Sequence, residues 1–119
     1  MRSKSDFINI DLTPEYKRNL KKLAKKYRNI RFDISSIILD LQQGNISGDR
    51  LGGFGLDIYI YKVRIKNSNI KKGKSAGYRL IYLLESETSI LLLTIYSKSK
   101  QEDITFNDIK SILNEYFEE

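Results

Sequence analysis

The chain has 119 residues, which is enough for one compact domain and too few for two. It contains no cysteine and no histidine, which excludes disulfides, thiolate and imidazole metal sites, and acid–base catalysis by histidine. Its formal net charge of +6 favours a polyanionic partner, and nucleic acid before a membrane surface.

The first part of the chain predicts one strand followed by two helices. Residues 7–12 alternate apolar and polar side chains, as a half-buried strand does. Thr13 and Pro14 are typical of a helix start, and apolar residues then recur on one helix face as far as Tyr27. A second helix is predicted from about Asp33 to Gly44. The short connection between the helices predicts an antiparallel helical hairpin.

The second part predicts three strands and a last helix. Five glycines between residues 44 and 55 indicate a loop. Strands are predicted over residues 56–66, 77–85 and 90–97, and the last of them is apolar on both faces, so we expect it inside the sheet. Thr105 and Asp108 predict a capping box at the final helix. We therefore predict a single α+β domain over residues 1–119, with an antiparallel-rich sheet and the order β-α-α-β-β-β-α.

The basic residues concentrate in the predicted sheet. Residues 59–100 hold nine basic and two acidic side chains, whereas residues 102–119 hold six acids and one lysine. Lys62, Arg64 and Lys66 alternate along one strand face, where like charges repel one another unless an anion binds. We interpret this face as an anion or RNA site, and the alternative is a solvated sheet face. The other cations expected to converge on one end of it are Lys71, Lys72, Lys74, Arg79, Lys98 and Lys100.

Three stretches of sequence resemble a known family. YKVRIK at residues 61–66, KGKSAGYRLIY at 72–82 and LTIYSK at 93–98 resemble the RelE/HigB branch of the RelE/ParE toxins of bacterial toxin–antitoxin modules. The predicted order of elements is similar as well. The resemblance implies a toxin that cleaves mRNA on the ribosome, inhibits translation and is neutralised by a cognate antitoxin. We accordingly expect a cytoplasmic protein without a membrane span, a metal or another cofactor.

The resemblance also implies roles for individual residues. Lys62 and Arg64 match the basic residues of a family strand, Arg79 matches its strand arginine, and Lys98 matches the lysine that ends the last strand. Well-studied members carry a further arginine and tyrosine where this chain has Ser99 and Thr105, so Tyr96, Lys98 and Lys100 are candidates to replace them, unless activity is reduced. The predicted catalytic residues are Arg64, Arg79, Tyr96 and Lys98, and the predicted RNA-binding residues are Lys62, Lys66, Lys71, Lys72, Lys74 and Lys100.

The implied chemistry needs neither histidine nor metal. The ribose 2′-hydroxyl attacks the adjacent phosphate, and arginines stabilise the growing negative charge. A lysine crowded by other cations is the candidate base. Two alternatives are a ParE-like toxin that binds DNA gyrase and a non-catalytic relative that binds RNA or antitoxin.

The expected antitoxin carries an acidic segment that lies over or beside the basic sheet face. Its apolar anchors are expected in grooves beside the tyrosines of residues 59–66 and the first-helix face.

Overall fold

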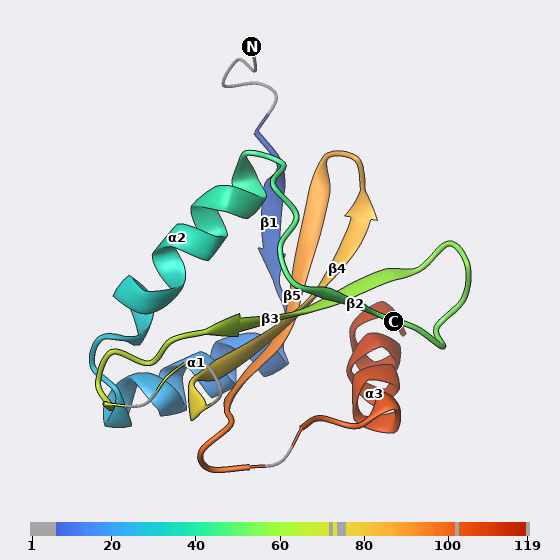
Figure 1. Cartoon of the computed structure of the whole chain (residues 1–119). Coiled ribbons are helices and arrows are strands. Elements are labelled where there is room, and N and C mark those ends of the chain that lie inside the picture. The colour runs from blue at the N-terminus through green and yellow to red at the C-terminus, as the bar shows by residue number, and fades with distance from the viewer. Residues whose placement is uncertain (1–6, 72, 74–75, 102, 119) are drawn as a thin grey trace.

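The computed structural model describes residues 7–71, 73, 76–101 and 103–118. Three helices and a five-stranded sheet form the predicted α+β fold (Figure 1). The elements in chain order are β1 (Asn9–Leu12), α1 (Pro14–Lys26), α2 (Ile30–Gln42), β2 (Asp49–Leu51), β3 (Tyr59–Ile65), β4 (Tyr78–Ser86), β5 (Ser89–Ser97) and α3 (Phe106–Phe117). None of the described helices has the length and apolar character needed to cross a membrane.

The sheet has the strand order β1-β5-β4-β3-β2. Strand β1 pairs with β5 in parallel, and all other neighbours are antiparallel. The prediction that β5 lies inside the sheet is confirmed, because it pairs with β1 on one side and β4 on the other. The short strand β2 was missed within the predicted loop. Its three residues are too few to show a periodicity, and they form a strand by pairing with residues 60–62 of β3.

The two faces of the sheet carry separate cores. Helices α1 and α2 lie against one face and α3 lies against the other (Figure 1). The alternation in β3 sorts its residues as predicted: Val63 and Ile65 belong to the core under α1 and α2, while Ile60 belongs to the core under α3. Lys62 and Arg64 follow Ile60 at steps of two, so they project on the α3 side.

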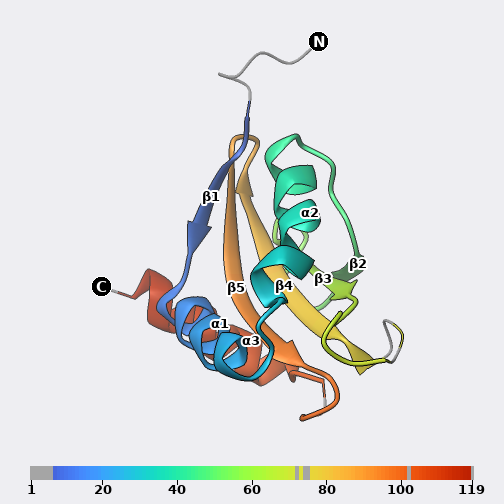
Figure 2. The same ribbon diagram turned by 90° about the vertical axis from the view of Figure 1, so that its left-hand side faces the viewer.

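Helices α1 and α2 follow each other as predicted but spread apart over the sheet rather than lying along one another (Figure 2). Each helix buries its apolar stripe against the strands, with Tyr16 from α1 and Ile34 from α2 in the same core. Helix α2 begins at Ile30, earlier than predicted, and Ile30 is fully buried. Its first turn is joined to the β3–β4 connection, because the carboxylate of Asp33 accepts from the backbone N–H of Ser68 at 2.9 Å.

Gly77 lets the start of β4 approach the end of β3. A Cβ atom at this position would collide with the backbone carbonyl of Ile65, so only glycine fits here. The resulting register places Arg79 directly opposite Arg64, and the next pairing places Arg79 opposite Tyr96 of β5. The packing of two backbones thus brings these predicted site residues into one row.

Candidate functional site

The cationic site lies on the α3 side of the sheet, near the end of β3 and the start of β4. Arg64, Arg79 and Tyr96 stand side by side on three adjacent strands. Lys62 precedes Arg64 by two residues and Lys98 directly follows β5. The structure thus places four of the cations expected to converge at this end of the sheet, with Tyr96 beside them, and their roles stay predictions. They come from three separate strands, and the antiparallel register alone brings them together.

The two arginines of this row differ in their surroundings. Arg79 is only 4% exposed, and its guanidinium donates to the backbone carbonyl of Tyr78 at 3.2 Å. Arg64 is exposed, and within the described part of the chain its guanidinium has no hydrogen-bond or ion-pair partner. One guanidinium is therefore held in the sheet while the other is accessible to an anion from solution. Guanidinium groups bind phosphate in a bidentate manner, which suits this arrangement.

Asp103 places a carboxylate among the cations. One oxygen lies 3.2 Å from the Lys98 ammonium nitrogen, and the other lies 3.9 Å from that of Lys62. Partial burial raises the pKa of Asp103, but the hydrogen bond from Lys98, the charge of Lys62 and the hydrogen bond from Tyr96 outweigh it and hold the pKa below its ordinary value. Composition alone sets residues 102–119 apart from the basic face as an acidic segment, so it does not predict this contact. The one signal for it in the sequence is the position of Asp103, five residues after Lys98.

Tyr96 is buried, and its hydroxyl forms hydrogen bonds with two neighbouring residues. It donates to the Asp103 carboxylate at 3.2 Å and accepts from the backbone N–H of Ile104 at the same distance. Burial, followed by the nearby carboxylate, raises the pKa of Tyr96 despite the Ile104 hydrogen bond and the Arg79 charge. The phenol is therefore protonated near neutral pH. Its observed contacts fasten the connection between β5 and α3 to the sheet.

The remaining predicted cations are more scattered. Lys66 and Lys71 are exposed near the end of β3, while Lys72 and Lys74 lie outside the described residues. The charge of Lys100 acts on Tyr27, the residue that caps the end of α1. Burial raises the pKa of that tyrosine, but hydrogen bonds to the serines at 99 and 97 and the charges of two lysines, Lys100 among them, lower it overall. The periodicity of the sequence does not single out Tyr27, because this residue simply continues the apolar face of the first helix.

The family model of the RelE toxin of the RelE/RelB toxin–antitoxin system matches residues 15–115. The chain belongs to the RelE toxin family. A search of curated protein sequences gives no match. Among solved structures, the chain is similar to the E. coli toxin RelE, in a mutant with two arginines replaced by alanine in the free state, with a TM-score of 0.55 and 18% sequence identity. The match covers 93% of this chain and 98% of that one, and it shows a shared fold.

The suspected family and the fold class of this RelE-family chain are thus confirmed. Its family is that of toxins in toxin–antitoxin systems, and membership implies an antitoxin as its partner. The predicted roles of individual residues remain proposals, which are developed below.

A groove of about 380 Å³ continues from the cationic site of this RelE-family chain around the outer edge of β3. Arg64 and Lys66 line it from the strand, and Phe32 lines it from α2. The Phe32 ring is 79% exposed. The groove therefore combines two cations with an accessible aromatic face. Proteins that bind single-stranded nucleic acids use cations to contact phosphates and aromatic rings to stack on bases.

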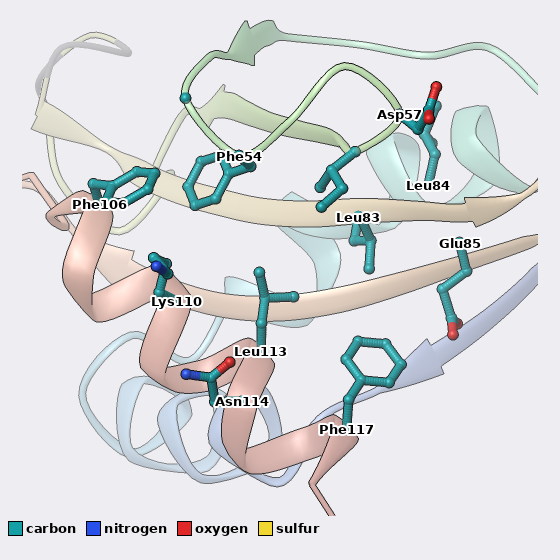
Figure 3. Close-up of a pocket in the computed structure, with 12 residues that line it drawn as sticks. Phe54, Asp57, Leu83, Leu84, Glu85, Phe106, Lys110, Leu113, Asn114 and Phe117 are labelled. Atoms are coloured by element: carbon teal, nitrogen blue, oxygen red, sulfur yellow. The ribbon is translucent and has the colours of Figure 1, made fainter.

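A second, larger pocket of about 520 Å³ lies between α3, the end of β4 and the loop before β3 (Figure 3). Leu83, Phe106 and Phe117 point into it, and Asp57 and Glu85 stand at its margin. Lys110 is the one cation among the described residues that line it. This composition offers an apolar surface rather than a site for phosphate chemistry.

The apolar grooves expected for an antitoxin are partly filled by the protein's own core. Tyr61 stacks on Tyr82 with ring centroids 5.5 Å apart, so it packs within the core side of the sheet. The apolar face of α1 is likewise packed against that core. Tyr59 is 39% exposed, so one tyrosine of the strand stays accessible. Where the antitoxin anchors stays a prediction, and the pocket beside α3 is a further accessible apolar surface.

Proposed function

We propose that this RelE-family toxin is a metal-independent endoribonuclease that cleaves mRNA on the ribosome and so inhibits translation. The observation that carries this proposal is the convergence of Lys62, Arg64, Arg79 and Lys98 on one end of one sheet face. Family membership supports the toxin role, and the cationic site supports a phosphodiester as the substrate. The ribosome and mRNA are the proposed partners of this face, in the cytoplasm.

The proposed reaction is transesterification within the RNA. A bond forms between the ribose 2′-oxygen and phosphorus while the bond from phosphorus to the 5′-oxygen breaks. The products are a 2′,3′-cyclic phosphate and a 5′-hydroxyl end. The guanidinium groups of Arg64 and Arg79 stabilise the negative charge on the phosphoryl oxygens, a kind of contribution worth about 10²–10³ in rate for one group. A lysine ammonium, from Lys62 or Lys98, gives the leaving 5′-oxygen its proton.

The proton of the 2′-hydroxyl is the harder part of the reaction. A lysine crowded only by cations could act as the base, but Lys62 and Lys98 both face the carboxylate of Asp103. Tyr96 is protonated and hydrogen-bonded, so it is not a free base. We therefore assign most of the acceleration to cationic stabilisation and to in-line positioning of mRNA by the ribosome, and transfer the 2′ proton to solvent.

A reconstituted translation reaction tests this function. The purified chain is treated with chelator and desalted to remove bound metal, then added to ribosomes in their usual Mg²⁺ buffer, and RNA 5′ ends are mapped with and without ribosomes. We expect cleavage within translated codons, 5′-hydroxyl ends, and little cleavage of free RNA. Cleavage that requires a metal, or equal cleavage of free RNA, contradicts the mechanism. Inhibition of DNA supercoiling without RNA cleavage would favour the gyrase-binding alternative.

We further propose that the antitoxin covers the basic end with an acidic segment. The support is electrostatic, since exposed cations at Arg64, Lys66 and Lys71 extend the site to its rim. An acidic partner is steered towards such a surface and associates faster at low salt. An antitoxin placed there shields the residues proposed to contact RNA. Association rates measured across a salt series test this placement, and a rate indifferent to salt would contradict it.

A further inference from the structure

The carboxylate of Asp103 contacts both lysines of the cationic site. Its carboxylate lies 3.2 Å from the Lys98 nitrogen and 3.9 Å from the Lys62 nitrogen, one contact on each oxygen. A carboxylate and a phosphate share the property that matters here, two negatively charged oxygens that accept from two ammonium groups. The side chains of Lys62 and Lys98 are only 20% and 30% exposed, so both ammonium groups are partly withdrawn from solvent.

We propose that Asp103 is a built-in counter-ion of a phosphate subsite formed by Lys62 and Lys98, and that the phosphodiester displaces its carboxylate on binding. This inference rests on the proposed function for the identity of the substrate, an RNA phosphodiester. The counter-ion relieves the repulsion between the cations while the site is empty. It also competes with the substrate, so it sets the affinity of the site for anions.

The contacts around Asp103 allow its side chain to leave without unfolding the site. The side chain is 49% exposed and belongs to the connection between β5 and α3, outside both elements. That connection has a separate attachment, because the backbone N–H of Ile104 donates to the Tyr96 hydroxyl. The helix that follows has its own capping box, formed by Thr105 and Asp108. Rotation of the Asp103 side chain therefore breaks its contacts with two lysines and Tyr96 while the backbone stays anchored.

Inorganic phosphate is the probe that tests this subsite without requiring RNA cleavage. It is titrated into the full-length chain and followed through the NMR signals of the Ile104 and Lys98 backbone amides. We expect Asp103→Asn, which keeps one oxygen to accept from Tyr96, to lower the phosphate dissociation constant about fivefold. Glu87→Gln removes one negative charge from the exposed β4–β5 turn and is the matched control. It should change the constant by less than about twofold, since it lies far from the lysines.

A double substitution identifies the lysines as the ligands. In a Lys98→Met background phosphate should bind more weakly, and the gain from Asp103→Asn should largely disappear. Unchanged phosphate binding in Asp103→Asn alone would overturn the proposal, because it would mean that the carboxylate does not compete with the anion. Weaker binding would overturn it as well, because it would mean that the carboxylate holds the lysines in place for the anion. Circular dichroism and thermal unfolding of each variant show whether the chain is folded.

The two proposals fail in different ways. Tighter phosphate binding in Asp103→Asn, in a chain that cleaves no mRNA during translation, would support the counter-ion and refute the nuclease. Normal cleavage together with a phosphate affinity that Asp103→Asn leaves unchanged would refute the counter-ion and keep the nuclease. Where cleavage is observed, we expect Asp103→Asn to lower the KM for RNA if the carboxylate competes with the substrate. A positioning role predicts a fall in kcat instead.

Discussion

The two ends of β4 differ in chemistry on the sheet face that α3 packs against. Near the start of β4, Arg79 stands in a row with Arg64 and Tyr96, and its guanidinium donates to the Tyr78 carbonyl. Near its end, Leu83 faces the larger pocket together with Phe106 of α3. A search guided by cavity size would choose the apolar end. The charged end is the better candidate for phosphate chemistry, because a reaction that develops negative charge needs oriented cations more than it needs volume.

Each end of the sheet carries a different unfavourable feature: charge repulsion at one end and exposed apolar surface at the other. Four cations close together repel one another, and the carboxylate of Asp103 offsets part of that repulsion. The apolar end leaves aromatic surface in contact with water, with Phe117 54% exposed. Such a patch favours a protein partner over a nucleic acid. Three predictions separate the functions of the two ends.

The largest effect is expected at Arg79. Arg79→Ala should abolish growth inhibition and reduce mRNA cleavage at least about 100-fold, because it removes a guanidinium that is fixed in the site. Arg79 is buried, so Arg79→Lys serves as a second variant that keeps the charge and loses the planar fork. It should also lose most of the activity. Colony formation after induction and cleavage during translation are the measurements.

Two controls accompany these variants. Arg28→Ala removes an exposed arginine from the turn between α1 and α2 and should leave toxicity intact. Circular dichroism shows whether Arg79→Ala and Arg79→Lys are folded. A folded Arg79→Ala chain that is still fully toxic would remove Arg79 from the active site.

The cationic end was largely predictable from sequence, and the reason is the two-residue period of strands. Alternation alone placed Lys62 and Arg64 on one face and Val63 on the other. The capping box of Thr105 and Asp108 was equally legible, since it depends on residues three positions apart. Local patterns of this kind survive folding because neighbours along the chain create them.

The parts that sequence did not reveal all depend on contacts between distant or irregular segments. Strand β2 exists because residues 49–51 find a partner in β3. The contact of Asp103 with Lys62 joins a connection after β5 to the middle of β3, and no period links the two. The apolar pocket beside α3 likewise forms from a loop, a strand and a helix that meet only in the folded chain.

An intermediate effect is expected on the rate at which the antitoxin associates. This effect shows which end of the sheet the antitoxin contacts first. Lys66→Glu reverses an exposed charge at the cationic end, and Lys110→Glu reverses one at the apolar pocket. If an acidic segment docks on the basic end, Lys66→Glu should slow association about fivefold, and Lys110→Glu should change it by less than about twofold. Stopped-flow kinetics at several salt concentrations measure both. The reverse pattern would place the initial contact on α3 instead.

The smallest expected effect is on the stability of the fold at low pH, through the carboxyl group of Asp103. Although partial burial raises the pKa of Asp103, Lys98, Lys62 and Tyr96 together hold it below its ordinary value of 3.8. A carboxylate with a lowered pKa stabilises the fold above its unfolded pKa, and this stabilisation is lost as the pH falls through the folded pKa. Because the side chain is half exposed, solvent screening limits the contribution to about 0.5 kcal/mol.

Carbon NMR of the Asp103 carboxyl group measures that titration directly. Its midpoint should lie below 3.8 in the native chain and move up towards this value in Lys98→Met, which removes the nearest ammonium. The matched substitution at the apolar end, Lys110→Met, should leave the midpoint where it is, because Lys110 contacts the Phe106 ring rather than Asp103. A native midpoint at or above 3.8 would mean that the lysines do not hold the carboxylate in solution. The carboxylate would still be charged at neutral pH, but it would not offset the repulsion between Lys62 and Lys98, which an anion from solution would then have to relieve.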